Sequence, residues 1–195
     1  TDSTHLSSDA IQAARTYVDK SFGAAYLPDK ANIYTSSNES AQEAHEAVRP
    51  TDVSRHPSSL PASLDEDQRR LYTLIWSRFV ACQMTPAKWH RTEIFFKRTD
   101  EDTGAIFKVS GRTLAFDGFY KASGVPTSDT EQNLPTLDKG KTLFPFSFNP
   151  KQVFSSPPSR YSEASLIKKL EAEGIGRPST YASIIDVIQF RKYVE

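Results

Sequence analysis

Several features that define other protein classes are scarce or missing in this sequence of 195 residues. It has one cysteine, Cys82, so an intramolecular disulfide framework is excluded, and this fits a protein of a reducing cytoplasm. No apolar run approaches the roughly 20 residues that a membrane-spanning helix requires. The residues from Thr1 onward show neither a signal-peptide layout nor an initiator methionine, so we expect the chain to start inside a longer protein.

The sequence also lacks the residue patterns of a self-contained catalytic centre. One cysteine and four scattered histidines match no zinc-binding spacing, so we expect no metal ligands in this chain. Neither a glycine-rich phosphate loop nor a serine–histidine–acid arrangement is recognisable. The formal net charge is zero, whereas nucleic-acid-binding proteins often carry a basic excess. Any contact with DNA must therefore depend on a few well-placed groups.

The first part of the chain has a helical pattern of apolar residues. Apolar residues recur at steps of three and four residues, which predicts a helix over residues 9–22. Ser7 or Ser8 can cap this helix, and Gly23 ends it. A shorter helix is expected over residues 40–48. The next 12 residues or so, up to residue 62, are rich in proline and favour an irregular connection.

The strongest helical signal covers residues 64–84. Residues 63–66 match a capping box. The apolar positions that follow are Leu71, Leu74, Ile75, Phe79 and Cys82. We therefore predict one long buried helix that ends before Pro86.

The composition changes at Lys88, where β-forming residues begin. Strands are expected over residues 89–97, 105–109 and 114–116, with a hairpin turn at residues 100–104 and a further edge strand over residues 142–148. The aromatic residues of this part could stack on bases, but their alternation favours a role in the core. They are Trp89, Phe95, Phe96, Phe107, Phe116 and Phe119.

Helices return after a proline-rich linker at residues 156–159. One helix is expected over residues 162–173, capped by Ser162, and a second is expected to begin at Pro178. The apolar stripe of the second helix comprises Tyr181, Ile184, Ile185 and Ile188. The order helical, β, helical predicts an α+β fold.

Three stretches stand out as motifs. They are Thr1-Asp2-Ser3, residues 40–51 with the sequence SAQEAHEAVRPT, and residues 161–182 with YSEASLIKKL followed by GIGRPSTYA. Their order and spacing resemble three blocks of bacterial type IA DNA topoisomerases. The first resembles the end of a Tyr-x-Arg-Thr-Asp-Ser motif, and the second resembles Ala-His-Glu-Ala-Ile-Arg-Pro with Val48 in place of isoleucine. The resemblance covers essentially the whole chain.

The resemblance implies a mechanism and a partner. In this family a tyrosine hydroxyl attacks a DNA phosphodiester, forms a 5′-phosphotyrosyl link and allows strand passage that relaxes negatively supercoiled DNA. The tyrosine and the motif arginine would precede Thr1, and Mg²⁺ would be bound by an upstream acidic Toprim domain. We therefore expect an isomerase parent that acts on DNA, chiefly single-stranded, in the cytoplasm with the nucleoid and not at a membrane. The 195 residues alone are expected to be inactive.

The resemblance also assigns candidate site residues in the first two blocks. His45 corresponds to a histidine beside the scissile phosphate, although an isolated histidine on a helix surface is the commoner case. Arg49 could pair with phosphate or form a local ion pair. Thr1, Asp2 and Ser3 could shape the turn that holds the tyrosine, cap the first helix, or do both.

The third block supplies the remaining candidate DNA contacts. Arg177, Ser179 and Thr180 are expected at a helix start, where free amides and hydroxyls can bind an anion. A plain helix cap is the commoner function of such residues, and the family block favours contact with the DNA backbone. Gln189 is a weaker candidate further along the same helix.

The resemblance further divides the chain into parts of three domains. Residues 1–86 would belong to the helical domain of the catalytic tyrosine, with a helix-turn-helix-like core, residues 87–156 to the return half of a β-rich arch, and residues 157–195 to a helical domain that grips single-stranded DNA. The partial arch should expose strand edges, through which isolated copies can pair. The alternative function is a non-catalytic module that binds single-stranded DNA or has an architectural role.

Overall fold

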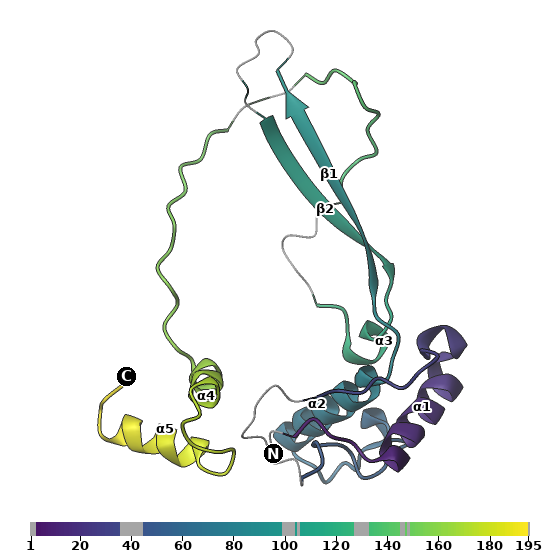
Figure 1. The fold of residues 1–195 in the computed structure, drawn as a ribbon, viewed down its shortest axis with the longest axis vertical. Coiled ribbons are helices and arrows are strands. Elements are labelled where there is room, and N and C mark those ends of the chain that lie inside the picture. The colour runs from purple at the N-terminus through teal and green to yellow at the C-terminus, as the bar shows by residue number, and fades with distance from the viewer. Residues whose placement is uncertain are drawn as a thin grey trace. The chain divides into compact units, whose positions relative to one another are not determined.

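The computed structural model describes residues 3–35, 45–98, 104, 106–126, 133–144, 147 and 149–194. These residues form five α-helices and one antiparallel sheet of two strands, which confirms the α+β class (Figure 1). The elements are α1 (Ser8–Phe22), α2 (Glu66–Cys82), β1 (Lys88–Lys97), β2 (Ile106–Phe116), α3 (Tyr120–Ser123), α4 (Glu163–Ala172) and α5 (Tyr181–Phe190). Among the described helices, none is long and apolar enough to cross a membrane.

The chain divides into two compact units. One unit comprises Leu6–Tyr34 and Val48–Leu137, and therefore holds α1, α2, the sheet and α3. The other comprises Thr1–His5, Thr35–Ala47 and Asp138–Glu195, and holds α4 and α5. Each unit is described separately below.

Helix α1 follows the sequence prediction closely. The Ser7 side chain accepts a hydrogen bond from the backbone amide of Ala10 at 3.3 Å, which satisfies one of the orphan amides of the first turn. The helix ends at Gly23, whose φ of 91° is a conformation that glycine adopts without strain. Ala14 and Val18 are fully buried, as the apolar stripe predicted.

Helix α2 differs from the prediction in its start and in its buried face. The N-cap is Asp65, which forms a capping box with Gln68, so the capping box predicted at residues 63–66 is wrong by two residues. Leu71 and Leu74 are 58% and 60% exposed, so the helix is not buried all round. Its buried residues are Trp76, Phe79 and Val80. The predicted apolar stripe included Phe79 but omitted Trp76 and Val80, which also lie on the buried side of the helix.

One apolar cluster joins α1 and α2. Its buried members are Ala10, Ala14, Val18, Val53, Trp76, Phe79, Val80 and Met84. The Trp76 ring packs edge-on against Tyr17 at 5.5 Å, and its Nε1 donates to the Val53 carbonyl at 2.8 Å. A buried indole needs such a partner for its only donor. We call this cluster and its two helices the α1–α2 body.

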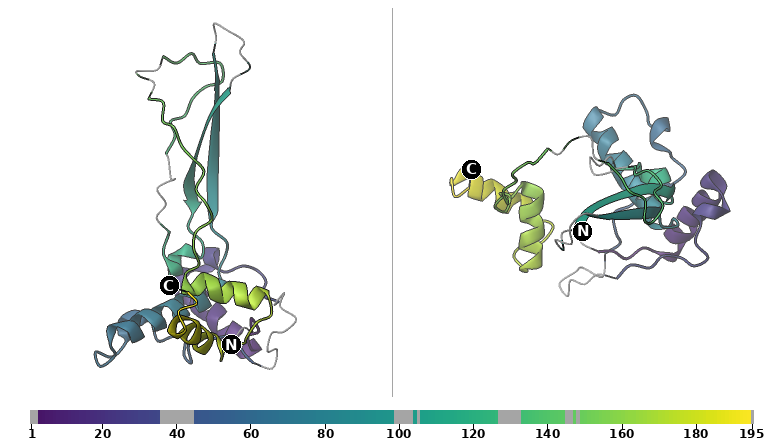
Figure 2. Two further views of the ribbon diagram at one scale, coloured as in Figure 1. Left: turned by 90° about the vertical axis from the view of Figure 1, so that its left-hand side faces the viewer. Right: turned by 90° about the horizontal axis from the view of Figure 1, so that it is seen from above.

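The hairpin of β1 and β2 projects from the α1–α2 body (Figures 1 and 2). Its antiparallel register pairs Trp89 with Leu114 and Lys97 with Ile106. The prediction of separate strands over residues 105–109 and 114–116 is wrong, because β2 is continuous through Gly111, which is buried opposite Thr92. The predicted turn at residues 100–104 lies outside the described residues except for Gly104.

The base of the hairpin is tied to the α1–α2 body by close backbone contacts. The Thr85 amide donates to the Tyr26 carbonyl and the Phe119 amide donates to the Thr85 carbonyl, each at 2.9 Å. Gly118 has a φ of 51°, and a Cβ there would lie 2.6 Å from backbone atoms of Thr85 to Ala87. Only glycine permits this approach. The short helix α3 that follows was not predicted, since its four residues carry too little periodicity.

Two further predicted elements, a helix over residues 40–48 and a strand over residues 142–148, are absent from the parts of these ranges that the structure describes. Residues 45–48 are not helical, and residues 40–44 of the same predicted helix lie outside the described residues. Residues 142–144 and 147 of the predicted edge strand are not in a strand, whereas residues 145, 146 and 148 are not described. Both segments are short, so their local propensity has little weight without a packing partner.

Helices α4 and α5 are joined by a tight turn and cross each other (Figure 2), and we call them the α4–α5 pair. The start of α4 is confirmed, because the Ser162 side chain accepts from the Ser165 amide at 3.3 Å. Helix α5 begins at Tyr181, three residues after the predicted start at Pro178, which lies in the preceding turn. The predicted stripe is confirmed, with Ile185 buried and its other members half-buried.

Candidate nucleic-acid interface

The segment that follows the first motif block is bonded to the described part of the second block. The Ala47 amide donates to the His5 carbonyl at 2.7 Å, which joins stretches about forty residues apart in the sequence. On the N-terminal side, the His5 amide donates to the Ser3 hydroxyl at 3.2 Å. Ser3 therefore shapes a turn directly beside the second block. Thr1 and Asp2 lie outside the described residues.

His45 and Arg49 of the second block differ in exposure. The His45 ring is exposed and can donate to or accept from a ligand. The Arg49 side chain is half-buried, and its Nη1 donates to the carbonyl of Pro50, the next residue, at 3.3 Å. Since Pro50 is buried, this end of the block is fixed in place. An imidazole and a guanidinium can each donate a hydrogen bond to a phosphate.

The third block forms a tight turn that precedes α5. The Arg177 amide donates to the Thr180 hydroxyl at 2.9 Å, and the Thr180 amide donates back to the Arg177 carbonyl at 2.8 Å. The Thr180 hydroxyl therefore takes part in a hydrogen bond within the turn. Arg177 is exposed, with its Nη1 donating to the Gly176 carbonyl at 2.8 Å, and Ser179 is exposed beside it.

The α5 N-terminus adds backbone donors to this turn. The Tyr181 amide donates to the Arg177 carbonyl at 3.1 Å, and the Ile184 amide donates to the Thr180 carbonyl at 3.0 Å. Among the described residues, the amides of Ala182 and Ser183 have no acceptor. These donors and the positive end of the helix can accept an anion.

Gln189 is not part of this turn. It lies nine residues after Thr180, or roughly 14 Å along the helix at about 1.5 Å per residue. Its side-chain amide donates to Glu163 at 3.5 Å, which links the far ends of α5 and α4. The structure thus groups Arg177, Ser179 and Thr180 and leaves Gln189 apart from them.

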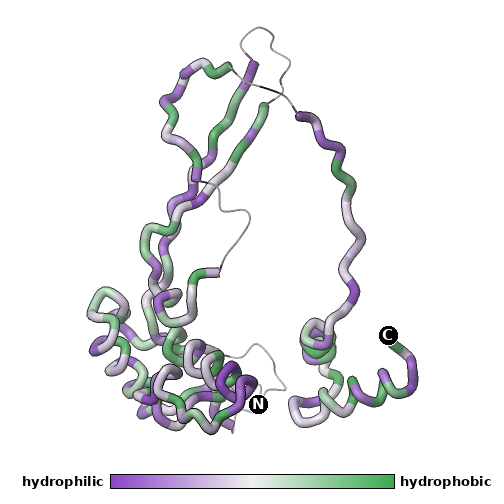
Figure 3. The backbone as a smooth tube through the Cα atoms, turned by 180° about the vertical axis from the view of Figure 1, so that it is seen from behind, coloured by the Kyte–Doolittle hydropathy of each residue, from purple (hydrophilic) through white to green (hydrophobic). Residues whose placement is uncertain are grey.

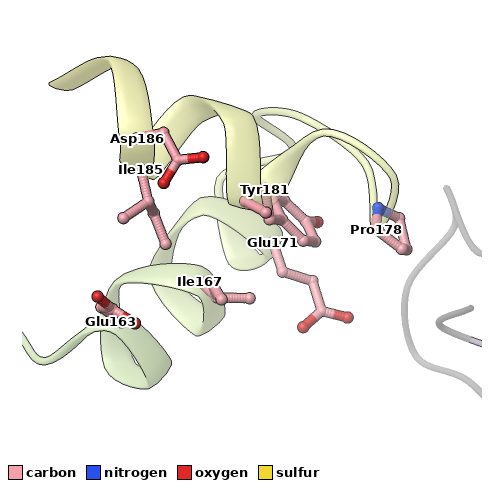
Figure 4. Close-up of a pocket in the computed structure, with 8 residues that line it drawn as sticks. Glu163, Ile167, Glu171, Pro178, Tyr181, Ile185 and Asp186 are labelled. Carbon is pink, nitrogen blue, oxygen red and sulfur yellow. The ribbon is translucent and has the colours of Figure 1, made fainter. Parts of the chain in front are cut away.

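An open groove of about 490 Å³ separates α4 from α5 (Figure 4). Its lining includes three carboxylates, those of Glu163, Glu171 and Asp186, together with the apolar side chains of Ile167 and Ile185. Like charges repel, so this side of the α4–α5 pair disfavours a phosphate backbone. The Arg177 turn is the part of the pair suited to an anion.

The sequence did not indicate that the β1–β2 hairpin has two chemically different faces. Both strands carry a mixture of hydrophilic and hydrophobic residues (Figure 3). The register places Arg91 directly opposite Arg112, with Glu93 opposite Ser110 on the same face. The residues between them, Thr92 and Gly111, point to the other face. Alternation of charged residues was visible in the sequence, but their pairing was not.

The described residues contain no group of three or more histidine, cysteine, aspartate or glutamate side chains able to hold a metal ion. Cys82 is a free thiol near the end of α2, and burial raises its pKa. A raised pKa keeps the thiol protonated and poorly nucleophilic. The candidate ligand contacts in the described part of the chain are therefore the hydrogen-bond donors of the second and third blocks.

Comparison with known proteins agrees with this chemistry. A family model described as DNA topoisomerase matches residues 1–195. The fold is similar to that of full-length topoisomerase I from Thermotoga maritima, with a TM-score of 0.78 and 34% identity over 100% of this chain and 30% of that one. DNA topoisomerase 1 of Pseudomonas aeruginosa is 49% identical and that of Campylobacter jejuni is 46% identical, each over 100% of this chain.

The chain therefore belongs to the bacterial type IA DNA topoisomerase family. It spans 22% of the length of the Pseudomonas relative and 27% of the Campylobacter relative. The chain thus corresponds to a fragment of such proteins.

Proposed function

We propose that this chain is part of an enzyme that relaxes negatively supercoiled DNA through transient single-strand cleavage and strand passage. The observation that carries the proposal is the hydrogen bond between Ala47 and His5, which links the segment after the first family motif to the second motif. A phosphate held at this junction would contact groups from both motifs. Family membership over residues 1–195 supports the same conclusion.

The cleavage step would be nucleophilic catalysis. A tyrosine hydroxyl of the parent, in the motif that ends with Thr1, Asp2 and Ser3, would attack the phosphodiester and become linked to the 5′ phosphate. The link conserves the bond energy for religation. His45 would donate a hydrogen bond to the scissile phosphate, and Arg49 would offset its charge. Mg²⁺ would be held by the acidic Toprim domain of the parent.

Single-stranded DNA would be held by the turn before α5. Arg177 and Ser179 are exposed and would contact the backbone, together with the amides of Ala182 and Ser183. Thr180 would act as a positioning residue, because its hydroxyl accepts the Arg177 amide. Gln189 would contribute at most a separate contact further along α5.

The domain assignment follows from the same proposal. Residues 1–86 would belong to the tyrosine domain, residues 87–156 to the return half of the arch, and residues 157–195 to the segment that grips the strand. The open edges of β1 and β2 would be covered in the parent, and isolated fragments would pair through them. Analytical ultracentrifugation of the fragment at increasing concentration tests this pairing.

A relaxation assay with negatively supercoiled plasmid and Mg²⁺ tests the enzymatic proposal. The parent should relax the plasmid, and the 195-residue fragment should not. A parent that binds single-stranded DNA without relaxing the plasmid would support the alternative of a non-catalytic module. A fragment that relaxes the plasmid alone would show that the tyrosine assignment is wrong.

Substitution of Arg177 tests the strand-binding turn. In the parent, Arg177→Ala should weaken binding of single-stranded DNA and reduce the slope of log affinity against log salt by about 0.7, the value for one lost phosphate contact. Lys168→Ala is the matched control, since it removes one exposed positive charge from α4. Equal affinities and equal slopes for the two variants would contradict the role of the turn.

A further inference from the structure

Residues 50–59 include the end of the second motif and the segment after it, and we call them the strap. Only Pro57–Ser59 form a regular element, a single 3₁₀ turn, yet the rest of the strap is held in place. The Asp52 carboxylate accepts the Ser54 amide at 2.9 Å and the Ser54 hydroxyl at 2.7 Å, which closes a turn. The hydrogen bonds from the Ser54 hydroxyl and amide lower the pKa of Asp52, so its carboxylate remains an ionised acceptor at neutral pH.

Helix α2 holds the strap through two aromatic side chains. The Trp76 indole donates to the Val53 carbonyl at 2.8 Å, and the Tyr72 hydroxyl donates to the Arg55 carbonyl at 2.7 Å. Tyr72 and Trp76 are four residues apart, so they lie on one face of α2, about one helical turn from each other. The strap is therefore bonded to the α1–α2 body at two carbonyls.

The two aromatic donors differ in what they contribute to folding. Trp76 is 2% exposed, so its N–H needs an acceptor for stability alone. The Tyr72 ring is half-buried and Arg55 is exposed, so water can replace either partner of their hydrogen bond. The Tyr72 hydroxyl is thus not required to satisfy a buried group, and its effect is to hold the strap against the helix.

The orientation of Arg49 depends on the strap. Its Nη1 donates to the Pro50 carbonyl at 3.3 Å, so the guanidinium follows the backbone of the residue that begins the strap. Pro50 is buried and its ring fixes its own φ angle, which restricts the backbone next to Arg49. A shift of the strap along α2 would therefore move the Pro50 carbonyl and the guanidinium together.

We infer that Tyr72 is a positioning residue for Arg49, which it orients by fixing the Arg55 carbonyl and with it the strap. The inference rests on the proposed function, in which Arg49 offsets the charge of the scissile phosphate. Tyr72 lies outside the three family motifs and its hydroxyl donates to the protein backbone, so it acts through Arg49 and not on DNA. A guanidinium held in one orientation loses little freedom when it pairs with a phosphate.

Single-turnover cleavage of a single-stranded oligonucleotide by the parent with Mg²⁺ tests the inference. Tyr72→Phe keeps the ring and removes the hydroxyl. It should lower the cleavage rate by up to about fivefold, the factor for one lost hydrogen bond, and leave the affinity for the oligonucleotide within about twofold. Tyr26→Phe is the matched control, because it removes a phenol hydrogen bond to Asp117 in the same unit and leaves the strap intact. The control should cleave like wild type.

A double-mutant cycle separates positioning from general destabilisation. Arg49→Gln alone should reduce the cleavage rate, and adding Tyr72→Phe should reduce it no further, because the side chain that Tyr72 orients is already gone. A loss of stability would instead lower the rate by the same factor with and without Arg49. Asp52→Ala opens the turn near the start of the strap and should show the same lack of additivity with Arg49→Gln.

The outcomes distinguish this inference from the proposed function. Wild-type cleavage by Tyr72→Phe and Asp52→Ala, additive losses in the cycle, or a wild-type rate for Arg49→Gln would overturn the inference, whereas relaxation by the parent would still support the proposed function. Equal losses in Tyr72→Phe and Tyr26→Phe would also overturn it, because the hydroxyl would then matter only for folding. If Tyr72→Phe fails to fold, the cycle with Asp52→Ala decides. A parent that cleaves no DNA would overturn the proposed function and the inference together.

Discussion

The α1–α2 body and the α4–α5 pair are both built from two amphipathic helices, yet they differ in how much apolar surface they bury. The body has eight buried residues in one cluster, including a tryptophan with its hydrogen bond satisfied. The pair has one buried residue, Ile185, and several large apolar side chains on its surface, such as Phe190 at 89% exposure. Equal helical patterns therefore do not imply equal stability.

The difference follows from what packs against each helix pair. In the body, residues around Val53 and the base of the β1–β2 hairpin cover the helices, and Gln83 bonds to Asn32 in the interior. The pair consists of two short helices, and isolated helices of about ten residues are marginal in water. We expect the pair to need other parts of the parent for its stability, and the body to need few.

Trp76→Ala should have the largest effect on the body. It removes a ring that is 2% exposed and leaves the Val53 carbonyl without its donor, so the free energy of unfolding should fall by about 3–5 kcal/mol. Urea denaturation followed by circular dichroism measures this change. A loss below about 1 kcal/mol would mean that the cluster does not control the stability of the body.

Gln83→Leu should have the next largest effect. The Gln83 side chain is fully buried, accepts from the Asn32 amide at 3.2 Å and donates to the Asn32 carbonyl at 2.9 Å. Leucine leaves both backbone groups unpaired, which costs about 1–3 kcal/mol. Gln12→Leu on the exposed side of α1 is the control and should change stability by less than about 0.5 kcal/mol. Equal effects of the two substitutions would contradict the role of the buried amide.

Ile185→Ala should affect the α4–α5 pair alone. Amide hydrogen exchange should accelerate in α4 and α5, because the pair loses its one buried side chain among the described residues. The unfolding midpoint of the body should change little, because Ile185 is not a member of the apolar cluster of the body. If exchange accelerates equally in α2, the two helix pairs form one cooperative unit and the contrast between them is wrong.

Tyr26→Phe should have the smallest effect, and the effect should depend on pH. The Tyr26 hydroxyl donates to Asp117 at 2.8 Å, and this hydrogen bond is the main cause that raises the pKa of Tyr26 above its ordinary value of 10.0. The folded chain therefore holds the phenol proton more tightly than the unfolded chain. The stabilisation is complete below about pH 10 and is lost as the pH rises through the folded pKa.

Denaturation midpoints measured near neutral pH and above about pH 10 test this prediction. Wild type should exceed Tyr26→Phe slightly at the lower pH, and the difference should shrink at the higher pH. Tyr193→Phe is the control, because Tyr193 is 70% exposed. A difference that is the same at both pH values would show that the hydroxyl contributes through packing and not through its proton.

The sequence predicted well those helices whose capping residue and apolar positions all lie in one continuous segment. Helix α1 with Ser7 and helix α4 with Ser162 were predicted well, because a cap and a 3.6-residue period are properties of neighbouring residues. The start of α5 was not, since Pro178 fits a first helical position as well as the turn that Thr180 closes. The orientation of α2 depended on Trp76, whose partner Val53 is distant in the sequence.

The candidate site also has features that the sequence predicted and features that only the fold produced. The motif residues His45 and Arg177 were recognisable in the sequence, because the family blocks are contiguous. The hydrogen bond from Ala47 to His5 was not predictable, because it joins segments that only the fold brings together. The arginine pair of the hairpin was missed because the β2 region was predicted as strands only over residues 105–109 and 114–116, which left Arg112 outside both of them.

The sequence by itself determined the family, the helical periods and the residue types available for anion binding. Tertiary structure decided which of those residues meet. A shift of one residue in the register between β1 and β2 would move Arg112 to the opposite face from Arg91, since side chains alternate along a strand. No segment of either strand encodes that register locally. The contacts that hold the base of the hairpin, the close approach of Gly118 to the body and the packing of Trp89 against Tyr120, join residues that only the fold brings together.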